Sequence, residues 1–165
     1  MPLVQPFDLL LTHDRWATVN ILNACEPLSS EQFHRRFEMG PGSLHATLTH
    51  VLAATLHWSM RLDPSVTRAR PDADGVQRTP TELLALHTEI YDEFESIARA
   101  HPLDDTITVN RNNITLTIPR GVAVTHLTTH NMHHRAQCVN MLRHVGVSPL
   151  PFTSVIEWQR MTGNA

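Results

Sequence analysis

Apolar residues recur every three or four positions along four long stretches of the chain, which is the spacing of amphipathic helices. Prolines, glycines and capping residues separate these stretches. Long helices are therefore predicted over residues 6–26, 43–62, 79–101 and 121–145. A short turn of helix is expected after Ser29, and a short amphipathic tail around Trp158.

Several helix starts carry recognisable capping residues. Ser43 is an N-cap candidate for the second long helix. Thr79 precedes Pro80 and is followed three residues later by Glu82, which is a capping-box arrangement. Residues 65–78 are polar, contain proline and glycine and show no period, so they are predicted to form a surface loop.

The period of the pattern changes just before the last long helix. Apolar residues alternate with Thr and Asn on both sides of an Asn110–Asn113 turn, from Ile107 to Ile118. Alternation of this kind is typical of a short β-hairpin. The expected fold class is all-α: a four-helix bundle with a small β-hairpin inserted before the last long helix, in a single domain over residues 1–165.

The charge balance and hydropathy exclude several kinds of function. Thirteen basic and sixteen acidic residues give a formal net charge of -3, without the basic excess that nucleic-acid binding requires. No apolar run approaches the roughly 18 residues of a membrane-spanning helix, and no basic segment precedes the first apolar stretch, as in a secretion signal. We expect a cytoplasmic protein that binds neither nucleic acid nor membrane. Cys25 and Cys138 are expected to be small core residues.

Histidine is the residue type that points to chemistry, since the chain has twelve histidines and one tyrosine. His126, His130 and His134 are spaced four apart, so they lie on one helix face about 6 Å from each other. Two imidazoles at this spacing can bind one metal ion. The pair could be His126 with His130 or His130 with His134, and spacing does not decide. A further ligand is expected from a facing helix, where His50 lies next to an apolar stripe.

The other histidines divide into two groups by position. Side chains that could line a pocket or face water are His45, His57, His87 and His133, together with His126. Side chains expected at the surface are His13, His34, His101 and His144.

Two segments carry a pattern that is similar to a known family. The segment from Thr125 to Gly146 contains a His, three residues, a His-Arg pair, a small residue and a Gln, followed by an apolar stretch that ends in Gly. In residues 43–62, a His is followed by a Trp and then by Arg-Leu. Both patterns closely resemble the DinB/YfiT-like proteins, and the likeness covers nearly the whole chain. One departure is Ala136, where many members have Gly.

The resemblance implies a fold and a ligand set. It implies a four-helix bundle of the up-down-down-up type, with a metal ion held by His50, His130 and His134 rather than by His126. Arg135 and Gln137 match the family pattern, and they are expected to fix the helix end or the helix packing rather than to take part in chemistry.

A site of three imidazoles limits the metals and the reactions. Nitrogen ligands without a carboxylate suit zinc, nickel or a neighbouring transition metal, and not calcium or magnesium. Three protein ligands leave positions for water or substrate. The resemblance implies a metal-dependent enzyme that activates a small thiol or water: a thiol-dependent S-transferase or isomerase, or a hydrolase. The alternative is a non-catalytic metal-binding or stress-response bundle.

Two further questions stay open at the level of the sequence. A general base cannot be chosen among Glu89, Asp92 and the spare histidines. Family members commonly pair through their bundle helices, so a homodimer is expected, and Trp16, Trp58 or Trp158 could be exposed at such a contact.

Overall fold

The computed structural model describes residues 5–111 and 113–163, and these are mostly helical. In chain order the elements are α1 (Pro6–Cys25), α2 (Ser30–His34), α3 (Leu44–Leu62), α4 (Pro80–Arg99), β1 (Thr106–Arg111), β2 (Ile114–Pro119), α5 (Arg120–His144) and α6 (Val155–Thr162). The described residues are thus mostly helical with one small antiparallel sheet, as the expected helical class with a β-hairpin requires. Asn112, in the predicted turn, lies outside the described residues.

The helix starts predicted at Ser43 and Thr79 are confirmed by side-chain caps. The hydroxyl oxygens of Ser43 and Thr79 accept hydrogen bonds from the backbone N–H groups of Ala46 and Glu82, at 3.0 and 3.3 Å. The carboxylate of Glu82 in turn accepts from the Thr79 N–H at 2.7 Å, which completes a capping box. Ser29 caps α2 in the same way. These local bonds satisfy N–H groups that have no partner within their own helix.

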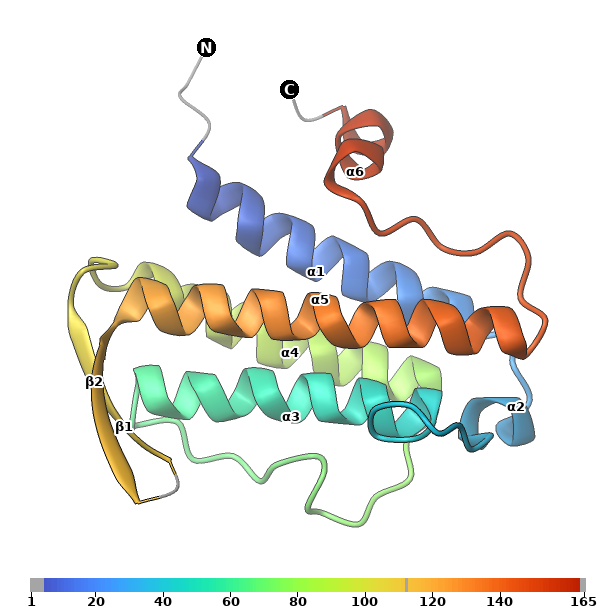
Figure 1. Ribbon diagram of the computed structural model, residues 1–165, viewed down its shortest axis with the longest axis horizontal. Coiled ribbons are helices and arrows are strands. Elements are labelled where there is room, and N and C mark those ends of the chain that lie inside the picture. The colour runs from blue at the N-terminus through green and yellow to red at the C-terminus, as the bar shows by residue number, and fades with distance from the viewer. Residues whose placement is uncertain (1–4, 112, 164–165) are drawn as a thin grey trace.

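The four long helices lie side by side, and the hairpin stands across one end of them (Figure 1). Helices α1 and α3 each pack against both α4 and α5. Strands β1 and β2 pair antiparallel, and the hairpin contacts α3 through β1 and α5 through β2. Residues 63–79 contain no helix or strand, as predicted for a loop, and they run along the outer side of α3 (Figure 1).

The buried apolar side chains form two clusters. Helix α5 contributes Cys138, Met141 and Leu142 to one cluster, and Ala123, Val124 and Leu127 to the other. The stretch of α5 between these two sets buries polar side chains instead: Thr128, Asn131, His134 and Arg135. Burying polar groups is costly unless they find partners. The middle of α5 is therefore where the chain departs from ordinary core packing.

Both cysteines belong to the apolar core, as expected. Cys25 and Cys138 are fully buried in the same cluster. Burial raises the pKa of the Cys25 thiol to about 12 and raises the pKa of the Cys138 thiol further. Both are therefore neutral thiols at physiological pH, and neither provides a thiolate.

Two predictions about exposed side chains are wrong. His13 is only 8% exposed, and its Nε2 lies 2.9 Å from the backbone oxygen of Thr153. Trp158 is 4% exposed. The reason is the same for both: the segment after α5 folds back so that α6 packs against α1 (Figure 1). None of the helices in the described residues is long and apolar enough to cross a membrane.

Candidate metal centre

Three histidine side chains from two helices converge in the polar middle of α5. Nε2 of His130 lies 3.3 Å from Nε2 of His50 and 3.2 Å from Nε2 of His134. One nitrogen from each ring lies within 4.8 Å of the other two. Around a tetrahedral zinc ion with bonds of about 2.0–2.1 Å, two ligand nitrogens stand about 3.3 Å apart. The three rings thus form a group that could hold a metal ion.

The convergence follows from helix geometry and from the packing of α3 against α5. His130 and His134 are one turn apart on α5, so their rings lie on the same face, with ring centroids 4.5 Å apart. His50 reaches them from α3, at centroid distances of 5.1 and 4.7 Å. His126 is one turn earlier on α5 and is not part of this group; its ring packs against Trp58 at 5.3 Å.

All three imidazoles are neutral at physiological pH. Burial is the largest cause that lowers the pKa of His50, His130 and His134. The pKa of His130 falls to about 4, because positive charge on His134 or His50 would also oppose its protonation. A neutral imidazole has a free lone pair, and a metal ligand must be in this state.

Gln137 fixes the orientation of one of these rings. Nδ1 of His134 donates a hydrogen bond to the side-chain oxygen of Gln137 at 2.9 Å, and the Gln137 amide nitrogen donates to Nε2 of His133 at 3.0 Å. With its proton on Nδ1, His134 directs the lone pair of Nε2 toward His130. The sequence pattern includes Gln137 but predicts only a packing role for it.

The loop before α3 leaves room for the Gln137 side chain at a glycine. Gly40 has φ of +49°, and a Cβ atom there would lie 2.2 Å from the Gln137 side-chain oxygen. Only a residue without a side chain allows this approach. Gly40, in the loop between α2 and α3, therefore provides space for the Gln137 side chain.

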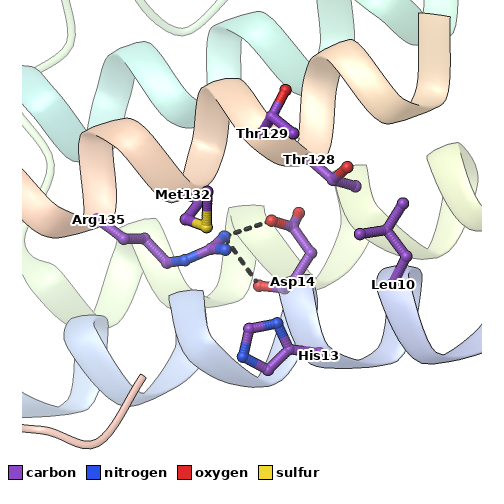
Figure 2. A pocket seen from close by; sticks show the side chains of 7 residues that line it. All are labelled: Leu10, His13, Asp14, Thr128, Thr129, Met132 and Arg135. Atoms are coloured by element: carbon purple, nitrogen blue, oxygen red, sulfur yellow. Dashed lines mark hydrogen bonds and ion pairs between the residues drawn. The ribbon is translucent and has the colours of Figure 1, made fainter. Parts of the chain in front are cut away.

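A buried ion pair joins the middle of α5, next to the histidines, to α1. The Arg135 guanidinium pairs with the Asp14 carboxylate, and their side chains are 4% and 1% exposed. Figure 2 shows Arg135 extending from α5 toward Asp14 on α1. Asn131 and Tyr91 donate to the second carboxylate oxygen of Asp14, at 3.0 and 3.2 Å. Sequence reasoning missed Asp14, because its partners lie more than seventy residues away.

This network positions the histidines without taking part in their chemistry. Asn131 and Arg135 each follow one of the α5 histidines in the chain, so bonds from them to α1 set the rotation of α5 about its axis. The hollow beside Asp14 and Arg135 measures about 50 Å³, and neither His130 nor His134 is among the α5 residues that line it. A space of that size holds water and not a substrate.

A larger cavity opens beside the three histidines. Its volume is about 560 Å³, which is within the usual range of about 300–1,000 Å³ for small-molecule sites. The residues that line it include His50 and His130, the expected pocket residues His57 and His126, and side chains from the hairpin. It is also lined by Arg61 and Arg70, which sequence reasoning missed. Arg61 belongs to the family-like pattern in which a His is followed by a Trp and then by Arg-Leu. That pattern could have identified Arg61 from the sequence.

The other expected pocket residues lie elsewhere. His133 is exposed and bonded to Gln137. His87 is buried on α4 beside Tyr91, where burial lowers its pKa to about 3. His45 is buried and stacks on half-buried His34 near α2, with ring centroids 4.6 Å apart.

Neither carboxylate considered as a general base reaches the cavity. Glu89 and Asp92 are exposed on α4 and form ion pairs with Arg68 and Arg15, at 3.0 and 2.6 Å. Within the described part of the chain, no Asp or Glu lines the cavity. A proton acceptor in this cavity would therefore be an imidazole.

The fold and the site define a helical protein with a three-imidazole group between two packed helices. The model of the DinB family matches residues 3–162, and the chain belongs to this family. The chain is similar to a DinB-like protein from Bacillus subtilis, whose crystal structure superimposes with a TM-score of 0.62 at 16% identity, over 88% of this chain and 97% of that one. This likeness shows a shared fold. No curated protein matches the chain significantly.

Proposed function

We propose that the chain is a metal-dependent enzyme of the DinB family, in which His50, His130 and His134 hold a divalent transition metal ion, zinc or nickel. The observation that carries this proposal is the convergence of three neutral imidazole nitrogens, at the spacing of ligands around one ion, beside a cavity of substrate size. Nitrogen donors without carboxylates favour these metals over calcium and magnesium.

The proposed reaction activates a small thiol or water, as in a thiol-dependent S-transferase or isomerase, or a hydrolase. A bound divalent ion would lower the pKa of a water or thiol that it binds, and it would polarise a carbonyl group. The chain's own residues orient the ligands and handle protons. The hydrogen bond to Gln137 holds the proton on Nδ1 of His134, so that the Nε2 lone pair points toward His50 and His130. Nε2 of His57 accepts a hydrogen bond from Arg61 at 2.7 Å, whereas His126 lines the cavity with no hydrogen-bond partner for its ring among the described residues, so His126 is the proposed proton acceptor.

We also propose the finer architecture that the resemblance implies. The directions of the four long helices in Figure 1 support an up-down-down-up bundle, since α1 and α5 run one way and α3 and α4 the other. The family match over residues 3–162 supports one domain. A homodimer is part of the proposal, although buried Trp158 cannot be at its contact. Light scattering on the purified protein measures the oligomeric state.

Metal analysis of protein purified without a histidine tag tests the ligand set. We expect one zinc or nickel ion per chain in the wild type, loss of the ion in His130→Ala, and its retention in the matched control His126→Ala. Loss in both variants alike, or no transition metal in the wild type, would contradict the proposed site.

A screen of low-molecular-weight thiols with electrophiles, and of hydrolysable esters and amides, tests catalysis. Turnover that rises in proportion to metal content supports the enzyme. Stoichiometric metal without turnover in any combination would favour the non-catalytic alternative, a metal-binding or stress-response protein.

A further inference from the structure

One face of α3 links the three-histidine group to an arginine. His50, His57 and Arg61 lie seven and four residues apart, which places them on the same side of the helix. Arg61 is eleven residues beyond His50, or about 16 Å along an axis that rises about 1.5 Å per residue. Its Nε donates to Nε2 of His57 at 2.7 Å, so the side chain turns back along the cavity toward the histidines.

In the part of the chain that the structure describes, no carboxylate pairs with the guanidinium of Arg61. Its polar contacts are His57 and, at 3.5 Å, the backbone oxygen of Asn110. Within the described residues, no carboxylate oxygen lies within 4.0 Å of its guanidinium. This holds also for Asp105, which lines a second surface depression together with Arg61. The second arginine of the cavity differs, because Arg70 is paired with Asp72 at 2.6 Å.

His57 does not supply the missing negative charge, since an imidazole is at most neutral. Burial lowers the pKa of His57, and the positive charge of Arg61 lowers it further. His57 therefore accepts the hydrogen bond from Arg61 and orients the guanidinium without balancing it. A guanidinium presents its donors in a planar fork that matches a carboxylate, and such pairs are among the stronger hydrogen bonds in proteins.

The remaining wall of the cavity is apolar. The hairpin contributes Val109, Leu116 and Ile118, and the helices contribute Trp58 and Val122. Leu116 and Val122 are 48% and 50% exposed, although they stand beside other apolar side chains. Exposed apolar side chains that gather around a concave site are typical of surface that a ligand covers.

We infer that the cavity binds a small organic acid, with its carboxylate on Arg61, its apolar body against Trp58 and the hairpin, and its reacting group toward His50 and His130. The inference names a substrate class for the proposed function and rests on that function for the position of the reacting group. The binding of the carboxylate itself depends on Arg61 and not on the metal.

A matched pair of probes tests the role of the charge. 4-Phenylbutyrate and its primary amide have the same shape, and only the first is an anion. We expect metal-free protein to bind the acid about tenfold more tightly than the amide in calorimetric titrations, as for one charge-assisted pair at a partly open site. The preference should disappear in Arg61→Gln and persist in part in Arg61→Lys.

Arg68→Gln is the matched control. It removes the same charge from a residue that pairs with Glu89 and does not line the cavity, so the preference for the acid should be unchanged. Circular dichroism shows whether each variant is folded. A preference that survives in folded Arg61→Gln, that is lost equally in Arg68→Gln, or that occurs only with zinc-loaded protein would overturn the inference. The last result would place the carboxylate on the metal.

Zinc stoichiometry measured on the same preparations separates this inference from the proposed function. One zinc ion per chain with equal affinity for acid and amide would overturn the substrate class and leave the metal site standing. A clear preference for the acid in protein that binds neither zinc nor nickel would support the carboxylate site and overturn the metal-dependent reaction.

Discussion

The side-chain oxygen of Gln137 accepts a hydrogen bond from Nδ1 of His134 at 2.9 Å, within one turn of α5. This bond decides which nitrogen of the ring carries the proton, and it leaves Nε2 free on the side of His130. The same amide group lies against Gly40 in the loop before α3. The position of the proton on His134, a proposed ligand, therefore depends on the loop at Gly40, almost a hundred residues earlier in the chain.

Replacing Gln137 should weaken metal binding without unfolding the protein. Gln137→Leu removes the acceptor that orients His134, and loss of such a partner typically lowers metal affinity about 10- to 100-fold. Competition with a chromophoric chelator measures the zinc affinity. His133→Ala, which removes the other partner of the Gln137 amide, should change it much less. Equal affinities in wild type and Gln137→Leu would contradict the orienting role.

Gly40→Ala should lower both stability and metal affinity. The new Cβ would stand 2.2 Å from the Gln137 oxygen at a φ of +49°, and a left-handed conformation costs an L-residue about 1 kcal/mol. Gly75→Ala is the matched control, because Gly75 has φ of +71° and no atom within 4 Å of the added Cβ. Thermal unfolding and zinc competition should show that both variants lose stability and that Gly40→Ala alone loses affinity.

Breaking the buried ion pair should cost much more stability than breaking an exposed one. Arg135→Met leaves the Asp14 carboxylate buried without its partner, and we expect a loss of about 3–5 kcal/mol in urea unfolding. Arg99→Met, which removes the exposed partner of Asp8, should cost about 1 kcal/mol or less. The double variant Asp14→Leu with Arg135→Met should regain part of the loss. Similar losses in the two single variants would contradict the high cost that is expected for a buried carboxylate without its partner.

His87 should make the protein sensitive to acid. Its pKa is lowered to about 3 in the folded state, mainly by burial, so the unfolded chain binds a proton more readily below pH 6.5. The stability that it contributes is complete above pH 6.5 and is lost as the pH falls toward 3. Unfolding of metal-free protein at several pH values measures this loss.

The variant His87→Leu isolates the effect. Nδ1 of His87 is buried without a partner in the described residues, so its removal should be close to neutral at pH 7. Between pH 7 and pH 4 the variant should lose less stability than the wild type, by up to about 3 kcal/mol. His101→Leu, at an exposed position, is the control and should follow the wild type. Identical pH profiles for wild type and His87→Leu would rule out this source of acid sensitivity.

Features that depend on neighbours in the chain were predictable. Ser43 and Thr79 cap helices through bonds to residues three positions later, and the spacing of His130 and His134 places both rings on one face. The change of period around Ile107 identified the hairpin for the same reason. His50 was a candidate because a third ligand was expected from a facing helix. Only the resemblance to a family selected the set of His50, His130 and His134, because periodicity does not say which faces of two helices meet.

The sequence by itself determined the helices, their caps, the hairpin and the pairing of His130 with His134, since each is set by side chains within a few residues of one another. Only the tertiary structure decided that Asp14 pairs with Arg135, that Gly40 makes room for Gln137, that Trp158 is buried and that Arg61 faces a cavity in which the described residues place no carboxylate. These relationships arise from the packing of segments far apart in the chain. The energies of these contacts depend on how deeply the side chains are buried and on which groups pair with them, and the spacing of residues along the chain determines neither.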